Sequence, residues 1–297
     1  MKKIVLFSGL IIILWGCADA PKKTAEEIAK EIHNEVLTVD SHTDTPWALL
    51  KGGFDLSKKH DFSKDHSRVD FPRMKEGGLD AVFMAAFVGQ SDRTEAGNKK
   101  AKEIVTTLID SIHAHVGSRS DLAAIALSPE DAYKLETEGK RAVFIGIENG
   151  YAIGNDIQNI SEFYLRGVRY MTLCHTKNND ICDSSTDTTG FNGLSDFGED
   201  VVKEMNRVGM MIDVSHISDS SFYEVVALTR VPVIASHSCA RAICNNPRNL
   251  SDDMLRKLAE NGGVIQMCIL SDYVKTPSNY AQRDSAYDAV RIKYRNF

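Results

Sequence analysis

The chain has no Cys-x-x-Cys pair, no long run of lysine or arginine and few cysteines. Five of the six cysteines remain once Cys17 in the N-terminal segment is set aside, and this odd number weakens the case for a disulfide framework. A bridge from Cys174 to Cys182 is geometrically conceivable, but buried free thiols are preferred in a domain of this size. The net charge of −6 without a basic run argues against a nucleic-acid binder, so a small molecule is the predicted partner.

The first residues differ from the rest of the chain. Two lysines precede an apolar stretch, residues 4–15, which is too short to span a bilayer as a stable helix and is typical of an export signal. The stretch ends in Leu14-Trp15-Gly16-Cys17, which resembles a bacterial lipobox, so residues 1–17 are predicted to be a signal peptide and Cys17 a lipidation site. Simple secretion with an incidental cysteine is the alternative. With residues 18–24 as a tether, we expect a bacterial lipoprotein that is anchored to a membrane, either periplasmic or at the cell surface.

Helical and strand patterns alternate along the remaining chain, which has 43% hydrophobic and 26% charged residues overall. Strand-like apolar runs lie at residues 36–40, 81–88, 142–147, 168–173, 209–214, 231–235 and 263–269. Helical patterns lie at residues 25–37, 95–116, 128–138, 159–166, 196–207, 218–229 and 251–261. Residues 51–68 have no clear period and are predicted to be a long loop. This alternation predicts an α/β fold with a parallel sheet.

Seven strands are one short of a closed (β/α)₈ barrel, because residues 270–297 contain no eighth apolar run. An open doubly wound sheet tolerates seven strands, but its ligands gather at a switch point rather than after nearly every strand. We therefore expect residues 25–297 to form an α/β domain with an incomplete (β/α)₈ TIM-like barrel, lacking the eighth strand and the C-terminal part.

Five acidic and histidine side chains follow predicted strands and are candidate metal ligands: His42, Asp44, Glu148, His216 and His237. In a barrel the ends of parallel strands meet at one rim, where these side chains become neighbours. Three imidazoles and two carboxylates can hold two divalent ions about 3.5 to 4 Å apart, and a shared carboxylate can bridge them. Zinc is the predicted metal, because neutral imidazoles suit it.

Each candidate also has a simpler structural explanation. His42 and Asp44 lie two residues apart and can grip one ion from an extended segment, but a capping aspartate beside a loop histidine has the same pattern. A lone histidine at a strand end is more often a hydrogen-bonded structural residue. Glu148 ends an apolar strand, where a carboxylate is costly to bury without a cation or hydrogen-bond donors.

Two further residues are candidate substrate contacts. His175 follows a predicted strand, and its imidazole could stabilise an oxygen that becomes negative during hydrolysis. Arg248 lies in the loop after the strand that carries His237, where a guanidinium could pair with a substrate carboxylate, although a solvated surface arginine is the simpler explanation.

The segments that carry these residues resemble the membrane dipeptidase family of zinc peptidases, also called renal dipeptidases, from about Val39 to Met267. The resemblance rests on Asp40-Ser-His42-Thr-Asp44-Thr-Pro-Trp47, Gly146-Ile-Glu148-Asn-Gly150, Gly167-Val-Arg-Tyr-Met-Thr-Leu-Cys-His175, Asn206-Arg-Val-Gly-Met-Met-Ile-Asp-Val-Ser-His216, Ala235-Ser-His237-Ser and Arg248-Asn249.

This resemblance implies an enzyme with two zinc ions on a (β/α)₈ TIM-like barrel of the metal-dependent hydrolase type. His42 and Asp44 would hold one ion, His216 and His237 the other, and Glu148 would bridge them. The resemblance also implies that a metal-bridged hydroxide hydrolyses dipeptides, including those with a C-terminal D-residue, and that homodimers are common.

The resemblance further implies that His175 polarises the scissile carbonyl and that Arg248 receives the free carboxylate of the dipeptide. The chain departs from the family pattern in one respect, since no Gly-x-Asp-x-Asp-Gly-like segment follows its last strand-like run. It is therefore expected to be C-terminally truncated and weakly active or inactive. The alternatives are a metal-binding lipoprotein without catalysis and another amidohydrolase-like metallohydrolase.

Overall fold

The computed structural model describes residues 23–276, 282, 285–286 and 289–290. The chain divides into two units, residues 1–36 and 37–297. In the first unit, α1 (Ala25–Glu35) begins at a capping box, in which Thr24 and Glu27 satisfy each other's backbone N–H groups. The expected signal peptide with its lipidated Cys17, and most of the expected tether, lie outside the described residues.

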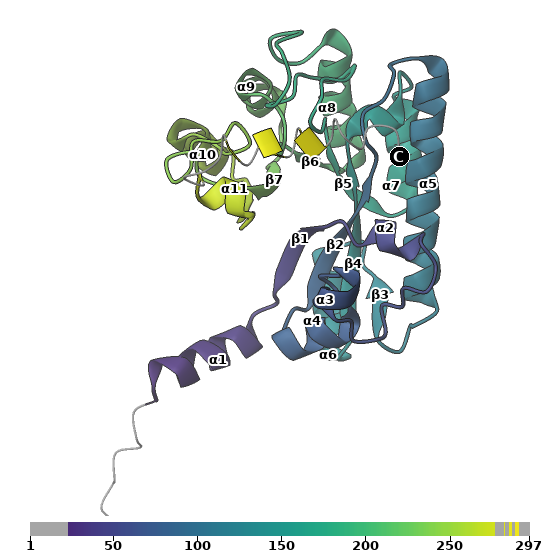
Figure 1. Ribbon diagram of the computed structural model, residues 1–297, viewed down its shortest axis with the longest axis vertical. Helices are drawn as coiled ribbons and strands as arrows, with labels where there is room; N and C mark the ends of the chain where they lie inside the picture. The colour runs from purple at the N-terminus through teal and green to yellow at the C-terminus, as the bar shows by residue number, and fades with distance from the viewer. Residues whose placement is uncertain (1–22, 277–281, 283–284, 287–288, 291–297) are drawn as a thin grey trace, which may run out of the picture. The chain divides into compact units, whose positions relative to one another are not determined.

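The second unit is built on one parallel sheet (Figure 1). Seven strands follow one another along the sheet in chain order and form a nearly closed TIM-like barrel, which confirms the predicted fold class: β1 (Val39–Thr43), β2 (Ala81–Phe87), β4 (Arg141–Glu148), β5 (Val168–Thr172), β6 (Met211–Asp213), β7 (Ile234–Ser238) and β8 (Val264–Met267). An eighth strand that sequence analysis missed, β3 (Ala123–Ile125), pairs only with β4 and has just three residues.

Helices connect the strands as the apolar periodicity predicted: α5 (Glu95–Gly117), α6 (Pro129–Thr137), α7 (Gln158–Leu165), α8 (Asp196–Val208), α9 (Asp219–Leu228) and α10 (Asp252–Glu260). Shorter helical turns lie between them: α2 (Pro46–Leu49), α3 (Phe62–Asp65), α4 (Phe71–Gly77), η1 (Gly150–Ile153) and α11 (Ser271–Val274). The region predicted as one long loop, residues 51–68, thus contains the short helix α3, which begins at the capping residue Asp61. No helix of the described residues has the length and apolarity needed to cross a membrane.

Strand β4 is buried along its whole length, and its two faces meet different surroundings. Val143, Ile145 and Ile147 join the larger core cluster, which also contains the apolar residues of α5 and α8. The alternate residues belong to the opposite face, because successive side chains of a strand point to opposite sides. Glu148 shares this second face with Phe144, whose ring stacks on Phe83 at a centroid distance of 4.7 Å.

Gly146 makes room for a large side chain on the same face. A Cβ atom at this position would lie 2.3 Å from the ring of Tyr170, so no other residue fits without moving that ring. Tyr170 is fully buried and also packs against Phe83. The glycine therefore lets a tyrosine occupy the space directly before Glu148.

Two strands lie about three residues later than predicted. β1 covers residues 39–43 rather than 36–40, and β7 covers residues 234–238 rather than 231–235, so His42 and His237 lie inside strands instead of after them. Apolar runs mark burial, whereas strand pairing depends on backbone hydrogen bonds. These bonds continue through the polar Ser-His residues.

The open edges of β1 and β8 are joined by a side chain. The amide of Gln266 accepts a hydrogen bond from Ser41 N–H at 2.7 Å and donates one to the Val39 carbonyl at 3.1 Å. A neighbouring parallel strand would bond to the same two groups on either side of Asp40, so the carboxamide takes the place of a peptide group. No strand of the described residues pairs with these two edges.

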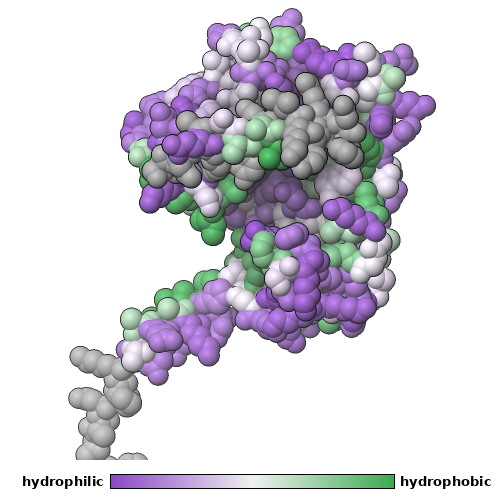
Figure 2. All heavy atoms as spheres, viewed as in Figure 1, coloured by the Kyte–Doolittle hydropathy of each residue, from purple (hydrophilic) through white to green (hydrophobic). Residues whose placement is uncertain are grey.

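The edge beside β8 is apolar. Val264 and Met267 expose more than half of their surface, as do Ile269 and Leu270 further along the chain. Figure 2 shows hydrophobic residues gathered in the region of α11 on an otherwise largely hydrophilic surface. An unpaired strand edge with apolar side chains beside it is a surface on which further chain can pair or pack.

Replacing Gln266 with methionine keeps the length of the side chain but removes its three hydrogen bonds to β1, which include one from the Ser41 hydroxyl at 2.7 Å. We expect the free energy of unfolding to fall by about 1 to 3 kcal/mol, because Ser41 N–H loses its partner. The matched change Gln158→Met, at an exposed helical position, should cost less than about 0.5 kcal/mol. Equal losses in urea unfolding of the two variants would show that the amide does not hold the edge.

Candidate metal centre

Four imidazoles surround the carboxylate of Glu148, the last residue of β4. Nε2 of His216 lies 3.1 Å and Nε2 of His237 3.4 Å from Glu148 Oε1. His175 Nε2 lies 3.6 Å from the same oxygen, and His42 Nε2 lies 3.5 Å from Oε2. The residues come from the C-terminal ends of strands β1, β4 and β7 and from the loops after β5 and β6. The structure therefore brings together residues that are far apart in the sequence.

These distances fit ligands of a metal ion. Two ligand atoms about 2.1 Å from a tetrahedral zinc ion lie about 3.4 Å from each other. The ring nitrogens of His216 and His237 are 2.9 Å apart, and each of the four imidazoles has a nitrogen between 3.1 and 3.6 Å from a Glu148 oxygen. The donor set of imidazoles and one carboxylate is also the set that divalent transition metals prefer.

The grouping of the donors differs from the pairing that the family resemblance implies. By distance, His42 and His237 form one group with Glu148, and His175 and His216 form the other. The rings of His42 and His237 are stacked with centroids 3.9 Å apart. Glu148 belongs to both groups, as expected of a bridging ligand. His175 belongs to one of them, although sequence analysis predicted that it contacts the substrate.

Asp44 lies at the edge of this cluster. Its carboxylate is 3.4 Å from His42 Nε2, and its side chain is 72% exposed. Asp44 belongs to neither donor group. Its predicted role as a ligand rests on its closeness to His42.

Burial and hydrogen bonding act in opposite directions on the two strongest charges. Burial raises the pKa of Glu148, but its interactions with the imidazoles of His216, His237 and His42 outweigh burial and hold this pKa well below its usual value. Burial likewise lowers the pKa of His42, but its bonds to Asp44 and Glu148 raise the pKa to about 10. An ionised carboxylate and a protonated His42 therefore face each other at neutral pH.

The other imidazoles are neutral at this pH. Burial lowers the pKa of His216 well below its usual value, and the nearby guanidinium of Arg248 lowers it further. Burial also lowers the pKa of His237 and of His175. Neutral imidazoles with free lone pairs are the form that binds metal.

The backbone of His216 is strained. Its φ angle is 73°, in the left-handed region that residues with a Cβ rarely adopt. The turn is held by two hydrogen bonds to its carbonyl, from Ser185 N–H at 2.8 Å and from Ser184 Oγ at 3.5 Å. Such strain is characteristic of functional sites.

Sequence analysis missed one polar partner of the cluster. The hydroxyl of Tyr170 lies 3.0 Å from Nδ1 of His42. Burial raises the pKa of Tyr170 well above its usual value, and the charges of Asp213 and Glu148 add to this effect, so the hydroxyl stays neutral and can orient the ring of His42. The available signal was parity, because Tyr170 lies two residues before Thr172, the last residue of β5, and so on the same side of the strand.

Arg248 is buried rather than on the surface, with 4% of its area exposed. One guanidinium nitrogen donates to the His237 carbonyl at 3.0 Å, and the group lies 5.4 Å from the centre of the Tyr273 ring. Nε is buried and has no hydrogen-bond partner among the described residues. A buried guanidinium with donors to spare can receive an anion next to the cluster.

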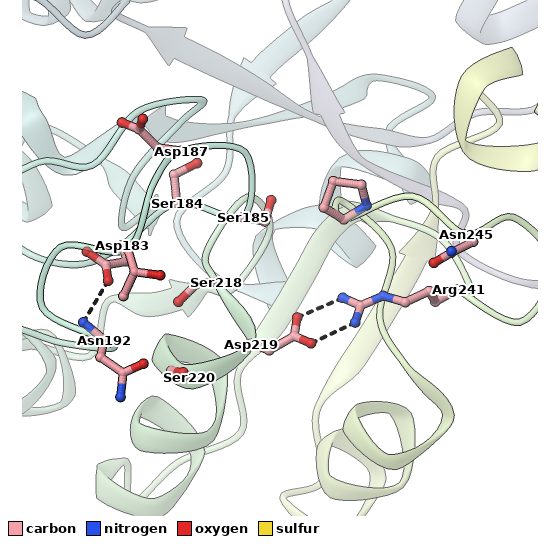
Figure 3. A pocket seen from close by; sticks show the side chains of 12 residues that line it. Asp183, Ser184, Ser185, Asp187, Asn192, Ser218, Asp219, Ser220, Arg241 and Asn245 are labelled. Atoms are coloured by element: carbon pink, nitrogen blue, oxygen red, sulfur yellow. Dashed lines mark hydrogen bonds and ion pairs between the residues drawn. The ribbon is translucent and has the colours of Figure 1, made fainter. Parts of the chain in front are cut away.

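A polar cavity of about 480 Å³ adjoins the loops that carry His175 and His216. Figure 3 shows its walls, with Asp219 and Arg241 paired through two hydrogen bonds of 2.6 and 2.7 Å. Ser184, which also lines the cavity, donates to the His175 carbonyl at 2.6 Å. The volume lies within the range of small-molecule sites.

Comparisons with known proteins identify the family of the chain. The chain matches the sequence profile described as membrane dipeptidase, peptidase family M19, over residues 26–292. It is 35% identical to Dipeptidase 3 of Macaca fascicularis over 249 residues. That alignment covers 81% of the chain and 49% of the relative, so the chain spans about half the length of this relative.

Solved structures show the same architecture. The crystal structure of the probable dipeptidase PvdM from Pseudomonas aeruginosa superposes with a TM-score of 0.79 at 29% identity, covering 90% of this chain and 68% of that one. A metallopeptidase from Rhodobacter sphaeroides, liganded with a phosphinate mimic of the dipeptide L-Ala-D-Ala, gives a TM-score of 0.70 at 20% identity. The superposition covers 85% of this chain and 81% of that one, and it supports the fold alone.

The affinity for a divalent metal should rise with pH. His42 must lose its proton to become a ligand, and its pKa of about 10 keeps it protonated at neutral pH, whereas His216, His237 and Glu148 have lowered pKa values and release no proton. The association constant should therefore increase about tenfold per pH unit between pH 7 and 9 and level off above pH 10. Zinc titrations in chelator-buffered solutions measure this slope, and a constant affinity over that range would contradict the assignment.

Proposed function

The chain belongs to the membrane dipeptidase family, and from this we propose that it hydrolyses the peptide bond of dipeptides at a centre of two zinc ions. The family is one of metallopeptidases, and the residues of the cluster offer the ligands that such an enzyme needs. The observation that carries the proposal is the place of Glu148, whose two oxygens reach both donor groups. A carboxylate shared by two ions is the usual device of metal-assisted hydrolysis.

The proposed ligands are His42, Asp44, His216 and His237, with Glu148 between the two ions. When bound, the ions would polarise the substrate carbonyl and lower the pKa of a bound water molecule to about 7. The protein holds these side chains on strand ends, so their arrangement is formed before the substrate arrives.

His175 has two possible roles. It lies within reach of a Glu148 oxygen, at 3.6 Å, and its ring packs 4.4 Å from that of His216, which places it at ligand distance. Its ring also packs edge-on against Phe87 at 4.7 Å, and its lowered pKa keeps it a neutral hydrogen-bond donor. We propose the second role, in which the imidazole donates to the carbonyl oxygen as negative charge develops there.

Arg248 is proposed to receive the free carboxylate of the dipeptide. Its burial beside the cluster and its hydrogen bond to the His237 carbonyl support this role. Nε has no hydrogen-bond partner among the described residues, so the guanidinium has a donor to spare. A guanidinium binds a carboxylate through two parallel hydrogen bonds, which selects short peptides with a free C-terminus.

The proposed substrates include dipeptides with a C-terminal D-residue, as the family resemblance implies. The Rhodobacter sphaeroides metallopeptidase binds a mimic of a dipeptide of this configuration. The expected lipid anchor at Cys17 and the expected homodimer stay predictions from the sequence.

A dipeptide panel tests the proposed function. The zinc-loaded protein should cleave dipeptides such as L-Ala-L-Ala and L-Ala-D-Ala, and cleave the corresponding C-terminal amide at least about tenfold more slowly because Arg248 loses its charged partner. Glu148→Gln should lower kcat/KM by about a thousandfold or more, since the shared ligand is lost.

The control for this panel is Glu103→Gln, the same change at an exposed position of α5, which should leave kcat/KM within about twofold. A zinc-loaded protein that leaves dipeptides intact would support a metal-binding protein without catalysis. Cleavage of lactones or cyclic amides instead would favour another amidohydrolase-like enzyme.

The two roles of His175 can be separated by metal content. His175→Ala should keep both zinc ions and lower kcat by about a hundredfold to a thousandfold, because one stabilising donor is lost. His175→Gln retains a donor and should recover part of this loss. Elemental analysis that finds one zinc ion fewer in His175→Ala would instead make His175 a ligand.

A further inference from the structure

A buried carboxylate lies beneath the metal centre. Asp213, the last residue of β6, is fully buried. Its Oδ1 accepts hydrogen bonds from the backbone N–H groups of Ser215 at 3.0 Å and Ser236 at 2.9 Å. Its Oδ2 accepts from the hydroxyls of Thr172 at 2.5 Å and Ser236 at 2.6 Å. Four donors thus converge on one side chain, which ties β5, β6 and β7 together where they reach the site.

These bonds determine where the proton of Ser236 lies. Both oxygens of Asp213 accept hydrogen bonds, and the hydroxyl of Ser236 donates its one proton to Oδ2 of Asp213. The same hydroxyl oxygen lies 2.7 Å from Nδ1 of His237. Because that oxygen has only lone pairs left to offer, Nδ1 must carry the hydrogen of the bond.

The tautomer of His237 follows. A neutral imidazole with its hydrogen on Nδ1 has a free lone pair on Nε2. Nε2 is the atom that points into the cluster, 3.4 Å from Glu148 and 2.9 Å from Nε2 of His216. The lone pair therefore faces the place where a metal ion would be held.

The partner ring is consistent with this assignment. Nδ1 of His216 is buried and has no hydrogen-bond partner among the described residues, so nothing there requires its hydrogen. A hydrogen on Nε2 of His216 can then be donated to Nε2 of His237 in the ion-free protein. The reverse tautomer of His237 would place two acceptors, its Nδ1 and the Ser236 oxygen, 2.7 Å apart.

We propose that Asp213 and Ser236 are positioning residues that hold His237 in the tautomer needed to bind metal. The inference rests on the proposed metal centre. Asp213 acts through Ser236, whose backbone and hydroxyl it grips at once, and Ser236 acts on the ring of His237. Hydrogen-bonded partners of this kind orient metal-binding histidines and keep the correct nitrogen free.

Thr172 provides a matched control. Its hydroxyl donates to the same Asp213 oxygen as that of Ser236 does, and both side chains are buried. Thr172→Val and Ser236→Ala therefore each remove one hydroxyl donor from Asp213. Only Ser236→Ala also removes the partner of His237.

Zinc affinity at pH 7.5 tests the proposal. Ser236→Ala should bind zinc about 10- to 100-fold more weakly than the unchanged protein, and Thr172→Val less than about threefold more weakly. Unfolding midpoints recorded for both variants show whether each remains folded. Equal losses of affinity in the two variants overturn the positioning role alone, whereas failure of the unchanged protein to bind zinc overturns the proposed metal centre.

A second measurement needs no metal. Nitrogen NMR of the ion-free protein, labelled at its histidines, distinguishes a protonated ring nitrogen from an unprotonated one. His237 should show a protonated Nδ1 and an unprotonated Nε2, and Ser236→Ala should shift this residue toward a mixture of both tautomers. A protonated Nε2 in the unchanged protein overturns the proposal.

Discussion

The charge of Glu148 is the constraint on which the rest of the site depends. A carboxylate at the end of a fully buried strand is tolerated only if donors or cations compensate its loss of water. Here four imidazoles supply that compensation from four other segments of the chain. The same carboxylate has two oxygens and is therefore suited to bridge the two proposed ions.

The barrel provides this geometry through the alternation of β4. One face of the strand joins the core that contains the helices, and the other carries Phe144, the gap at Gly146 and then Glu148. Because Gly146 admits the ring of Tyr170, the hydroxyl of that ring reaches His42 across the barrel. The missing side chain of Gly146 thus allows the polar contact between Tyr170 and His42.

The residues around the cluster share the work of orienting it. Tyr170 contacts the far nitrogen of His42, and Ser236 contacts that of His237, while the near nitrogens of both rings turn toward Glu148. Burial lowers the pKa of His216, and the fixed positive charge of Arg248 lowers it further, so this imidazole is neutral. The proposed ligands, their orienting partners and the proposed receptor of the substrate carboxylate therefore lie within one small region at the C-terminal ends of the strands.

Much of this protein could be predicted from its sequence. Apolar runs located the seven strands of the barrel path, apolar periodicity located the main helices, and residue type at strand ends singled out Glu148 and the histidines. Hydrophobicity could not locate β3, which is too short to leave a pattern. It also placed β1 and β7 about three residues early, because burial and backbone pairing need not end at the same residue.

By itself, then, the sequence determined which side chains could hold a metal, because ligand chemistry belongs to the residue type and strand order follows local periodicity. Only the tertiary structure decided how those side chains are grouped and oriented. The closeness of His175 to His216, the bonds of Gln266 to β1 and the four donors on Asp213 join segments that are distant in the chain. Such contacts depend on the register and twist of the folded sheet, which no local pattern of residues encodes.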